Sequence, residues 1–257
     1  MGMLDNIQTG KENKPPRIMI YGSEGVGKTT FGASAPDAVF IQTEDGLSEI
    51  DCKKFPLAHT LAEVVSELTA LRDEQHSFRT VVIDSVDWLE RIIFDEVCRE
   101  FGVRSIEKAD GGYGRGYVHA LTHWRKILNI LQELRDKRGM MIILVAHAKV
   151  ERFEDPENAA YDRYTPRLHK HAASLIAEWV DAVLFANKKF RVTKENAGFS
   201  GERAIAAPIG ADGGERIIRT VGSPACIAKN RFGLPSEIPL SWQAFINAYA
   251  KVEAAHA

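Results

Sequence analysis

The chain has 257 residues, enough to bury a sizeable hydrophobic core in one large domain or two small ones. Its 45% hydrophobic, 26% charged and 9% aromatic residues are typical of a globular protein and exclude a disordered tail protein. The 33 basic and 35 acidic side chains give a formal net charge of -2, which excludes a global positive field for nucleic acid. Any DNA contact must therefore be local.

The cysteines and the N-terminus indicate the cellular compartment. Three widely spaced cysteines without a CxxC motif favour neither a disulfide framework nor a zinc site. The N-terminal residues lack the apolar segment of a signal peptide, and no apolar run approaches the ~18 residues that span a bilayer. We therefore expect a cytoplasmic protein that makes no membrane contact.

Residues 1–16 are polar and end in two prolines, so we expect a flexible N-terminal arm, with a single α/β domain over residues 17–257. Short, mostly apolar segments that hardly alternate follow this arm. Such segments are typical of strands buried on both faces of a parallel sheet. They are Arg17–Tyr21, Val39–Gln42, Thr80–Asp84, Met140–Ala146 and Asp181–Ala186.

Two amphipathic segments between these strands predict helices. One begins at Thr60, which can form a capping box with Glu63. The other runs from about His119 to Arg138 and ends at Gly139. Strands that alternate with helices predict right-handed βαβ units, and hence an α/β fold with a mostly parallel, twisted sheet flanked by helices.

The chain changes character after Lys188. The segments FRVTK, ERAIAAPI, ERIIRTV and ACIAK are separated by glycine-rich turns, a pattern typical of antiparallel strands. We expect these strands to extend one edge of the sheet.

The segment GSEGVGKT matches the phosphate-binding motif GxxxxGK[ST] and lies between an apolar strand and a plausible helix. Its glycines let backbone N–H groups wrap a phosphate chain. We expect Lys28 to reach the β- and γ-phosphates and Thr29 to ligate Mg²⁺, so the predicted cofactors are ATP and Mg²⁺. The alternative is a chance match in a glycine turn. The predicted nucleotide-binding residues are Gly22, Ser23, Glu24, Gly25, Val26, Gly27, Lys28, Thr29 and Thr30.

A second apolar strand ends in a carboxylate. Asp84 closes the segment TVVID, and we expect it to hold Mg²⁺, usually through water, at the sheet edge where the phosphate loop lies. In the alternative, Asp84 only ends the strand and caps a helix that begins near Val86. Asp87 is the competing carboxylate.

Two further strand ends carry polar groups suited to chemistry at a γ-phosphate. Glu44 follows the strand Val39–Gln42, where a carboxylate can orient and polarise the attacking water, although Glu-Asp-Gly is also a good turn sequence. His147 follows the strand Met140–Ala146, where it can hydrogen-bond the γ-phosphate and sense its loss. The alternative for His147 is a structural role. With Lys28, these two residues are the predicted catalytic groups.

The order of GSEGVGKT, FIQTEDG, VVIDSV, IILVAH and KNRFG resembles the RecA-like ATPase core over roughly residues 17–235. More narrowly, the chain resembles the short phage-encoded RecA-like ATPases of the Sak single-strand-annealing group. This resemblance implies a RecA-like P-loop fold and, if a phage encodes the chain, a place in the host cytoplasm. In relatives, the glutamate after the second strand activates water, and the position of His147 is usually glutamine.

The resemblance also implies groups that act on a neighbouring subunit. In relatives, the KNRFG-like segment reaches the γ-phosphate of the next subunit, so Lys229 and Arg231 become candidate catalytic residues in trans. The alternative is a solvated basic turn after an edge strand. A trans-acting residue requires a homo-oligomer, as either a ring or a filament.

The family has two mobile loops that meet single-stranded DNA, and the first has a counterpart before the long helix. It is GGYGRGY, in which Tyr113, Arg115 and Tyr117 suit base stacking and phosphate contact. The alternative is a surface loop unrelated to DNA.

The counterpart of the second mobile loop follows the fourth strand, in residues 149–167. It supplies Lys149, Arg152 and Arg163 as candidate DNA-binding residues. Nearby carboxylates nearly cancel its charge, which leaves a weak electrostatic footprint. Here too the alternative is a loop unrelated to DNA.

The motifs and the resemblance together predict an ATPase that hydrolyses ATP slowly alone and assembles on single-stranded DNA to promote annealing or strand exchange. The expected partners are single-stranded DNA, further copies of the chain and a single-strand-binding protein. The alternatives are a helicase motor or loader, a small-molecule kinase, and a nucleotide-gated binding module without DNA. A glutamate aimed at water and the absence of an Arg-rich lid count against the kinase.

Overall fold

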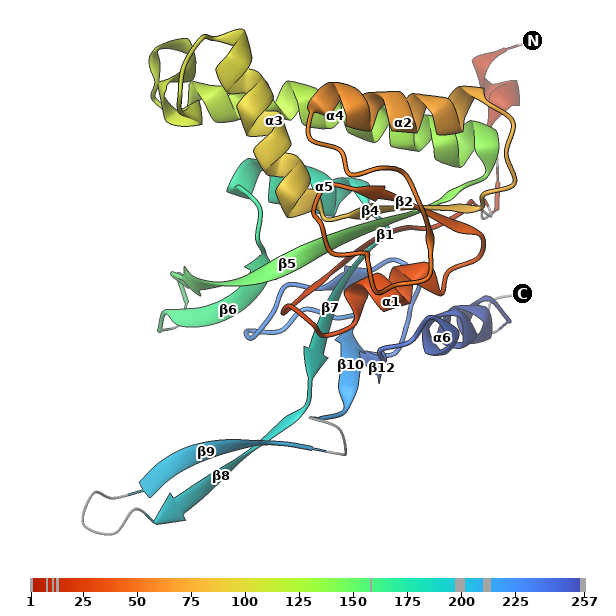
Figure 1. Cartoon of the computed structure of the whole chain (residues 1–257). Helices are drawn as coiled ribbons and strands as arrows, with labels where there is room; N and C mark the ends of the chain where they lie inside the picture. Colours follow the sequence, from red (N-terminus) through yellow and green to blue (C-terminus); the bar gives the residue numbers. More distant parts are fainter. Residues whose placement is uncertain are drawn as a thin grey trace.

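The computed structural model describes residues 2–254, apart from 8, 11, 13, 158, 197–201 and 210–213. A β-sheet runs through the molecule with helices on both faces (Figure 1). The strands of this sheet are β1 (Arg17–Gly22), β2 (Ala38–Gln42), β3 (Lys53–Lys54), β4 (Thr80–Asp84), β5 (Met141–Phe153), β6 (Tyr161–Pro166), β7 (Ala182–Lys188), β10 (Arg216–Arg219), β11 (Lys229–Asn230) and β12 (Glu237–Pro239).

The strand that leads into the phosphate loop lies inside the sheet. The order is β12-β10-β7-β1-β5-β4-β2-β3, and the strands from β7 to β3 are parallel. Every residue of β4 and all but the first of β1 are buried, as their continuous apolar sequences predict. The predicted α/β fold, with a mostly parallel sheet flanked by helices and antiparallel strands at one edge, is confirmed.

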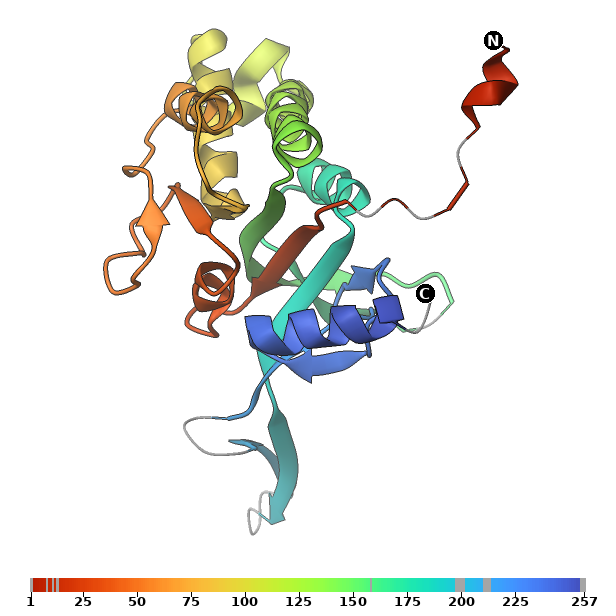
Figure 2. The same cartoon turned by 90° about the vertical axis from the view of Figure 1, so that its right-hand side faces the viewer.

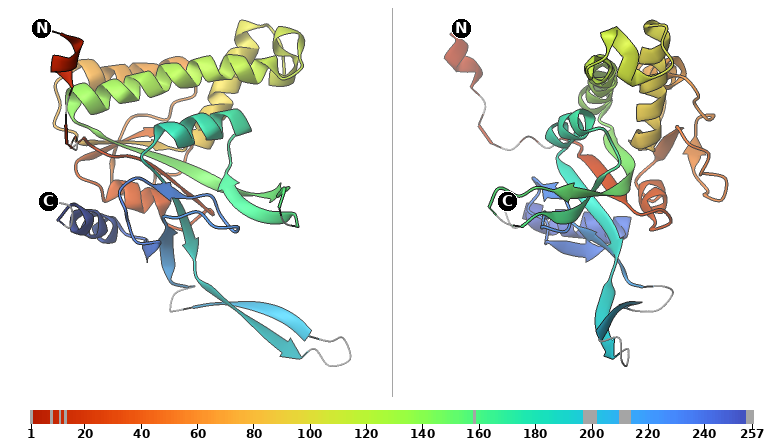
Figure 3. Two further views of the ribbon diagram at one scale, coloured as in Figure 1. Left: turned by 180° about the vertical axis from the view of Figure 1, so that it is seen from behind. Right: turned by 90° about the vertical axis from the view of Figure 1, so that its left-hand side faces the viewer.

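The helices form one layer on each face of the sheet. Figures 1 and 3 show helices over both faces of the sheet. The first layer contains α2 (Leu61–Asp73), α3 (Val86–Glu100), α4 (Arg115–Arg138) and α5 (Lys170–Trp179), and the second contains α1 (Lys28–Ala33) and α6 (Trp242–Ala254). Thr60 and Glu63 form the predicted capping box at the start of α2.

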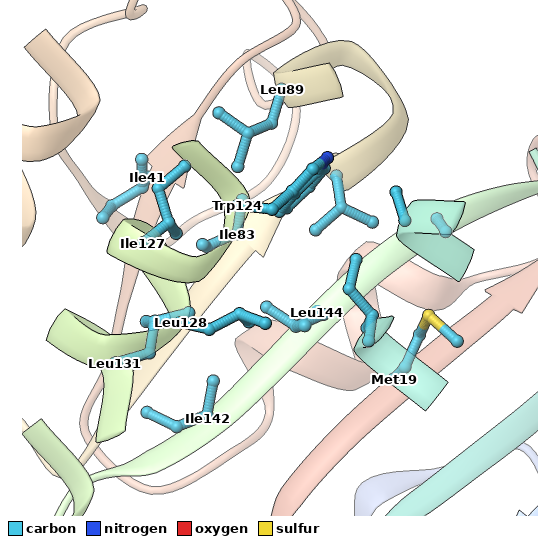
Figure 4. Packing of buried hydrophobic residues seen from close by; sticks show 14 of the residues in the cluster. Met19, Ile41, Ile83, Leu89, Trp124, Ile127, Leu128, Leu131, Ile142 and Leu144 are labelled. Atoms are coloured by element: carbon cyan, nitrogen blue, oxygen red, sulfur yellow. The ribbon is translucent and has the colours of Figure 1, made fainter. Parts of the chain in front are cut away.

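The larger part of the core lies between the sheet and the four-helix layer (Figure 4). Trp124, Leu128 and Leu131 of α4 belong to the same buried cluster as Ile83 of β4 and Ile142 of β5. Burial of each such side chain stabilises the fold by about 1.5–3 kcal/mol. This packing holds the sheet, and therefore its strand ends, in place.

The long helix begins earlier than the sequence predicts, at Arg115 instead of about His119. Gly114 adopts a left-handed φ of 78° and starts the helix. A Cβ atom on Gly116 would lie 2.1 Å from the carbonyl oxygen of Ile106, so this glycine permits close packing inside a helix. The glycine-rich segment 111–117 therefore contains the start of a helix and a close contact with the backbone of Ile106, in addition to the predicted loop.

The predicted second mobile loop is a β-hairpin. β5 continues to Phe153 and pairs in antiparallel register with β6, from Ala148 opposite Pro166 to Phe153 opposite Tyr161. The pairing satisfies the backbone hydrogen bonds of both segments, which the family resemblance had implied to be a mobile loop.

The antiparallel strands after Lys188 extend the sheet only in part. β10 pairs with β7 and β12 pairs with β10, as predicted. The strands β8 (Phe190–Asn196) and β9 (Glu202–Pro208) instead pair with each other in a ribbon that projects from the body (Figure 1). The reason is that β10 already occupies the edge of β7.

The segment ACIAK also departs from its prediction as an edge strand. Cys226 makes isolated bridges with Tyr164 and Ser223, and Lys229 alone enters a strand, β11, which pairs with β7.

The N-terminal segment contains a short 3-10 helix, η1 (Met3–Asn6), which stands apart from the body in Figure 2. Its residues are exposed. The division into a flexible arm and one domain stays a prediction. No helix in the described part of the chain is long and apolar enough to cross a membrane.

Candidate nucleotide-binding site

The loop between β1 and α1 depends on glycine at three positions. A Cβ atom on Gly22 would lie 2.2 Å from the carbonyl oxygen of Ala186 on the neighbouring β7. Gly25 and Gly27 adopt φ values of 68° and 111°, which side chains rarely accept. These conformations wrap the chain back toward the strand end before α1 begins at Lys28.

Lys28 is buried inside this loop. Its Nζ atom donates to the carbonyl oxygens of Gly22 and Ser23, at 3.0 and 2.8 Å. Burial lowers the pKa of Lys28, against the opposing effect of the nearby carboxylates. A bound phosphate would add the counter-charge that favours the ammonium form.

Thr29 and Asp84 meet at the predicted metal position. The Thr29 Oγ1 atom donates to Asp84 Oδ2 at 2.7 Å, and burial raises the pKa of Asp84. A hydroxyl and a carboxylate are oxygen ligands of the kind that Mg²⁺ prefers, and Mg²⁺ keeps several waters beside them. The donor set therefore fits a Mg²⁺ ion held with the help of nucleotide phosphates.

Glu44 follows β2 and is partly buried in the same pocket. Its Oε1 atom lies 3.9 Å from Nε2 of His147. Burial raises the pKa of Glu44, and the nearby His147 lowers it. A carboxylate in this setting can accept a proton from a water molecule.

Asp87 orients His147. It accepts the backbone N–H of His147 at 3.0 Å and lies 3.1 Å from the ring Nδ1 atom. Burial would raise the pKa of Asp87, but hydrogen bonds from His147 and Arg167 hold it well below its usual range. Because an ionised carboxylate only accepts hydrogen bonds, Nδ1 carries the hydrogen and Nε2 faces Glu44.

Arg167 is a site residue that the sequence reasoning missed. Its guanidinium lies 2.8 Å from Asp87 and 3.6 Å from Glu24 of the phosphate loop. Its backbone N–H donates to the carbonyl oxygen of His147 at 2.8 Å. Arg167 therefore joins the phosphate loop to the start of the hairpin. Arg167 is distant in sequence from Glu24 and Asp87. The antiparallel pairing of β6 with β5 brings it close to them.

These groups surround a pocket of about 430 Å³. Of the predicted nucleotide-binding residues, Gly22, Ser23, Glu24 and Val26 do not line it, and the side chain of Val26 is buried in the core. The lining residues are Gly25, Gly27, Lys28, Thr29, Thr30, Glu44, Asp45, Gly46, Leu47, Ile50, Asp84, His147 and Arg216.

Arg216 is a second cation in this pocket. Its Nη1 atom lies 3.3 Å from the position of a Cβ atom on Gly27, and no carboxylate in the described residues pairs with it. The sequence signal was present in ERIIRTV, which is predicted as an edge strand. The missing information was the pairing of β10 with β7, which brings this strand beside the phosphate loop.

Lys229 and Arg231 lie near the amino-terminal ends of the parallel strands, opposite the strand ends that carry the phosphate loop. Lys229 pairs with Val183 near the start of β7, and its Nζ atom donates to the carbonyl oxygen of Ala177. The Arg231 guanidinium lies 3.6 Å from Asp181, just before β7. Because the phosphate loop follows the far end of the parallel strands, neither residue can reach the nucleotide pocket of its own chain.

The structure separates the residues of the first predicted DNA loop. Tyr113 is 98% exposed. Arg115 begins α4 and donates to the carbonyl oxygen of Asp110. Tyr117 lies within α4 and stacks on His169, with ring centroids 4.0 Å apart. Tyr113 therefore has no ring partner among the described residues, whereas Tyr117 already has a stacking partner.

The residues of the second predicted DNA segment lie on two faces of the hairpin. Lys149 and Arg163 line the same cavity. Arg152 is the direct partner of Asp162 on the alternate face and forms an exposed ion pair with Glu154 at 3.2 Å. The structure thus brings together two of these three basic residues.

Comparisons place these features among known proteins. A family model described as "AAA domain" matches residues 14–232. The chain is 25% identical, over 183 residues, to the SPbeta prophage-derived uncharacterized protein YorG of Bacillus subtilis. The aligned region covers 70% of this chain and 52% of that protein. The chain therefore spans about half the length of this curated relative. The crystal structure of the RadB recombinase matches with a TM-score of 0.48 and 12% identity, over 90% of both chains.

Proposed function

The chain belongs to the AAA domain family of P-loop ATPases, and on this premise we propose that it hydrolyses ATP with Mg²⁺ and acts as an oligomer on single-stranded DNA. The observation that supports hydrolysis is the convergence of Lys28, the Thr29–Asp84 pair and Glu44 in one pocket. Asp45 and His147 line the same pocket and are the competing bases.

Each of these groups has a distinct part in the reaction. Lys28 balances the charge of the β- and γ-phosphates. Thr29 and Asp84 would hold Mg²⁺, which neutralises charge on the phosphates when bound. Glu44 accepts a proton from the attacking water. His147, fixed by Asp87, presents Nε2 to the γ-phosphate side of the pocket.

Action on DNA is supported by the connection between the pocket and the hairpin. Lys149 lies two residues beyond His147 on β5, and Arg163 lies four residues before Arg167 on β6. A change at the γ-phosphate that moves His147 or Arg167 would therefore reach these two basic residues through the backbone. The resemblance to Sak-type annealing ATPases supports the same assignment, with annealing or strand exchange as the activity.

The test is the ATPase rate with and without single-stranded DNA, at two salt concentrations. We expect stimulation by DNA that decreases at high salt, because phosphate contacts release counterions. Lys28→Ala should abolish ATP hydrolysis while the circular dichroism spectrum stays unchanged. Normal hydrolysis by this variant contradicts the proposed site.

A DNA-independent rate would favour the nucleotide-gated module. Directional unwinding of a forked duplex would favour the helicase motor or loader.

A further inference from the structure

Glu44, His147 and Asp87 lie in a row that leads from the nucleotide pocket into the body of the protein. Nε2 of His147 lies 3.9 Å from Oε1 of Glu44, and Nδ1 on the other side of the ring lies 3.1 Å from Oδ2 of Asp87. The exposed fraction of the side chain falls along this row, from 21% for Glu44 through 13% for His147 to 2% for Asp87. The imidazole ring therefore connects a carboxylate of the pocket with a buried carboxylate of α3.

Asp87 fixes the ring of His147 in one orientation. Its Oδ1 atom accepts the backbone N–H of His147 at 3.0 Å, and both carboxylate oxygens lie within 3.2 Å of Nδ1. Although Asp87 is buried, hydrogen bonds from His147 and Arg167 hold its pKa well below its usual range, so the carboxylate is ionised. With the ring hydrogen on Nδ1, Nε2 of the neutral imidazole is a proton acceptor directed at Glu44.

A carboxylate that takes a proton from water must lose it again before the next ATP molecule reacts. Burial raises the pKa of Glu44, an effect that the nearby His147 opposes. The raised pKa favours the protonated form of Glu44 and therefore delays its return to the form that accepts a proton. A second acceptor beside Glu44 removes this delay, and histidine is the side chain best suited to accept and release protons near neutral pH.

We propose that His147 is the proton acceptor for Glu44 and that Asp87 is the positioning residue for this transfer, an inference that rests on the proposed function. Glu44 takes a proton from water as the water oxygen bonds to the γ-phosphorus. The bond from this phosphorus to the bridging oxygen breaks, and its electron pair stays on ADP. The proton then moves from Glu44 to Nε2 of His147, which releases it to solvent water.

The distance between Glu44 and His147 must shorten for this transfer, because 3.9 Å exceeds the length of a hydrogen bond. Catalytic hydrogen bonds are often long before substrate binds and shorten in the complex. His147 lies on β5 and is held by Asp87, whereas Glu44 follows the end of β2 in a segment without regular secondary structure. We therefore expect Glu44 to make the approach while the histidine ring stays fixed.

The experiment measures single-turnover cleavage of ATP by the full chain with Mg²⁺, and it uses chemical rescue of His147→Ala. This variant should be slowed at least ~100-fold, as expected for the loss of an acid–base group. Imidazole can enter the space left by the ring, and pyrazole has the same shape but is a far weaker base. We expect the rate to rise about tenfold or more with imidazole and to stay unchanged with pyrazole.

Equal rescue by the two compounds shows that the ring only fills space or donates a hydrogen bond, and it overturns the proposal. His59→Ala, at an exposed position, is the matched control and should keep the wild-type rate with either compound. His147→Gln gives a further test, because an amide can hydrogen-bond a phosphate but cannot accept the proton. This variant should be as slow as His147→Ala, and a wild-type rate overturns the transfer.

The position of the ring hydrogen tests the role of Asp87 without any measurement of activity. The nitrogen NMR shifts of the His147 ring show which nitrogen is protonated, and the signals are assigned by their absence from His147→Ala. We expect the hydrogen on Nδ1 in the wild type and on Nε2 in Asp87→Asn, whose amide N–H can donate to Nδ1. Asp95→Asn, at an exposed position of α3, should keep the wild-type pattern. A hydrogen on Nε2 in the wild type, or no change in Asp87→Asn, overturns the positioning role.

The outcomes separate the proton transfer from the proposed function. If the wild type cleaves ATP and His147→Ala does so at the same rate, hydrolysis stands and the transfer is wrong. If Glu44→Gln keeps the wild-type rate while His147→Ala is slow, His147 takes the proton from water itself, and the transfer from Glu44 is again wrong. If the wild type does not cleave ATP, the proposed function and the transfer both fail, and the position of the ring hydrogen alone decides whether Asp87 positions His147.

Discussion

Asp84 and Asp87 are three residues apart, yet their surroundings give them different tasks. Asp84 accepts a hydrogen bond from Thr29, and burial raises its pKa. Asp87 accepts hydrogen bonds from His147 and Arg167, which keep its pKa low despite burial. Asp84 is therefore the carboxylate placed to share a cation with Thr29, and Asp87 is a positioning residue for two side chains.

Glu44→Gln tests the general base. The variant keeps the size of the side chain but cannot accept a proton, so we expect ATP binding to persist and hydrolysis to slow at least ~100-fold. Binding by calorimetry and turnover by phosphate release measure the two effects. Asp45→Asn is the matched control, because Asp45 lines the same pocket. If the control loses activity and Glu44→Gln does not, the base is Asp45.

Arg216→Ala tests the second cation of the pocket. A hydrogen bond to a charged group contributes about 1.5–3 kcal/mol, so the Kd for ADP should rise at least about tenfold. Arg219→Ala is the control, because Arg219 is on the same strand with its side chain on the alternate face. Equal ADP affinity in both variants would show that Arg216 does not contact the bound nucleotide.

The motif residues of the site could be predicted because their spacing is local. Lys28 and Thr29 follow one strand, and the apolar run before Asp84 marks the end of another. Arg167 and Arg216 could not be found in this way. Their positions depend on two antiparallel pairings, of β6 with β5 and of β10 with β7, which single-strand patterns do not specify.

Between elements, a buried carboxylate joins α3 to α5. Glu90 of α3 accepts the backbone N–H of His169, just before α5, at 2.8 Å, while its other oxygen is buried without a hydrogen-bond partner among the described residues. Burial raises the pKa of Glu90 to about 7. The folded protein therefore keeps a proton on Glu90 that the unfolded chain releases at lower pH.

The raised pKa of Glu90 predicts a loss of stability as the pH rises. Between the ordinary pKa of 4.5 and about 7, the folded state binds more protons at Glu90 than the unfolded state, so the free energy of unfolding decreases across this window. The decrease amounts to about 3 kcal/mol, since each pKa unit corresponds to about 1.4 kcal/mol. Urea denaturation at pH 4.5 and 7.5 measures it.

Glu90→Gln should remove this part of the pH dependence, because an amide does not titrate. Glu49→Gln, at an exposed position, is the control and should retain it. If the slopes of wild type and Glu90→Gln agree, Glu90 ionises in the folded protein as it does in the unfolded chain.

The sequence predicted most elements correctly because apolar runs and caps are local signals. The capping box at Thr60 and the strand that ends at Asp84 both lie where expected. The errors arose where packing between elements that are distant in sequence determines the local conformation. Gly116 is helical because it packs on Ile106, and β5 extends to Phe153 because β6 returns beside it.

On the scale of the whole molecule, the length of the parallel strands separates the cations of the nucleotide pocket, Lys28 and Arg216, from Arg17 and Arg231. The phosphate loop follows Gly22 at one end of β1, whereas Arg17 at the other end shares Asp181 with Arg231. Five residue steps of a parallel strand span roughly 16 Å. A role of Arg231 in hydrolysis must therefore be exerted on another copy of the chain, which is why the proposed oligomer matters for activity.

The mixing of two inactive variants tests this role. An arginine supplied in trans increases the rate by ~10³–10⁵ in other P-loop enzymes, so Arg231→Ala should bind ATP but lose DNA-stimulated hydrolysis. Lys28→Ala should be inactive because its own phosphate loop is incomplete. In a mixture, an intact phosphate loop from the first variant can meet an intact Arg231 from the second, and partial activity should return. Lys188→Ala mixed with Lys28→Ala is the control for dilution effects. Exchange of labelled subunits must be observed in parallel. If subunits exchange and the mixture stays inactive, or if Arg231→Ala alone hydrolyses ATP normally, the catalytic groups are complete within one chain and Arg231 serves only its ion pair with Asp181.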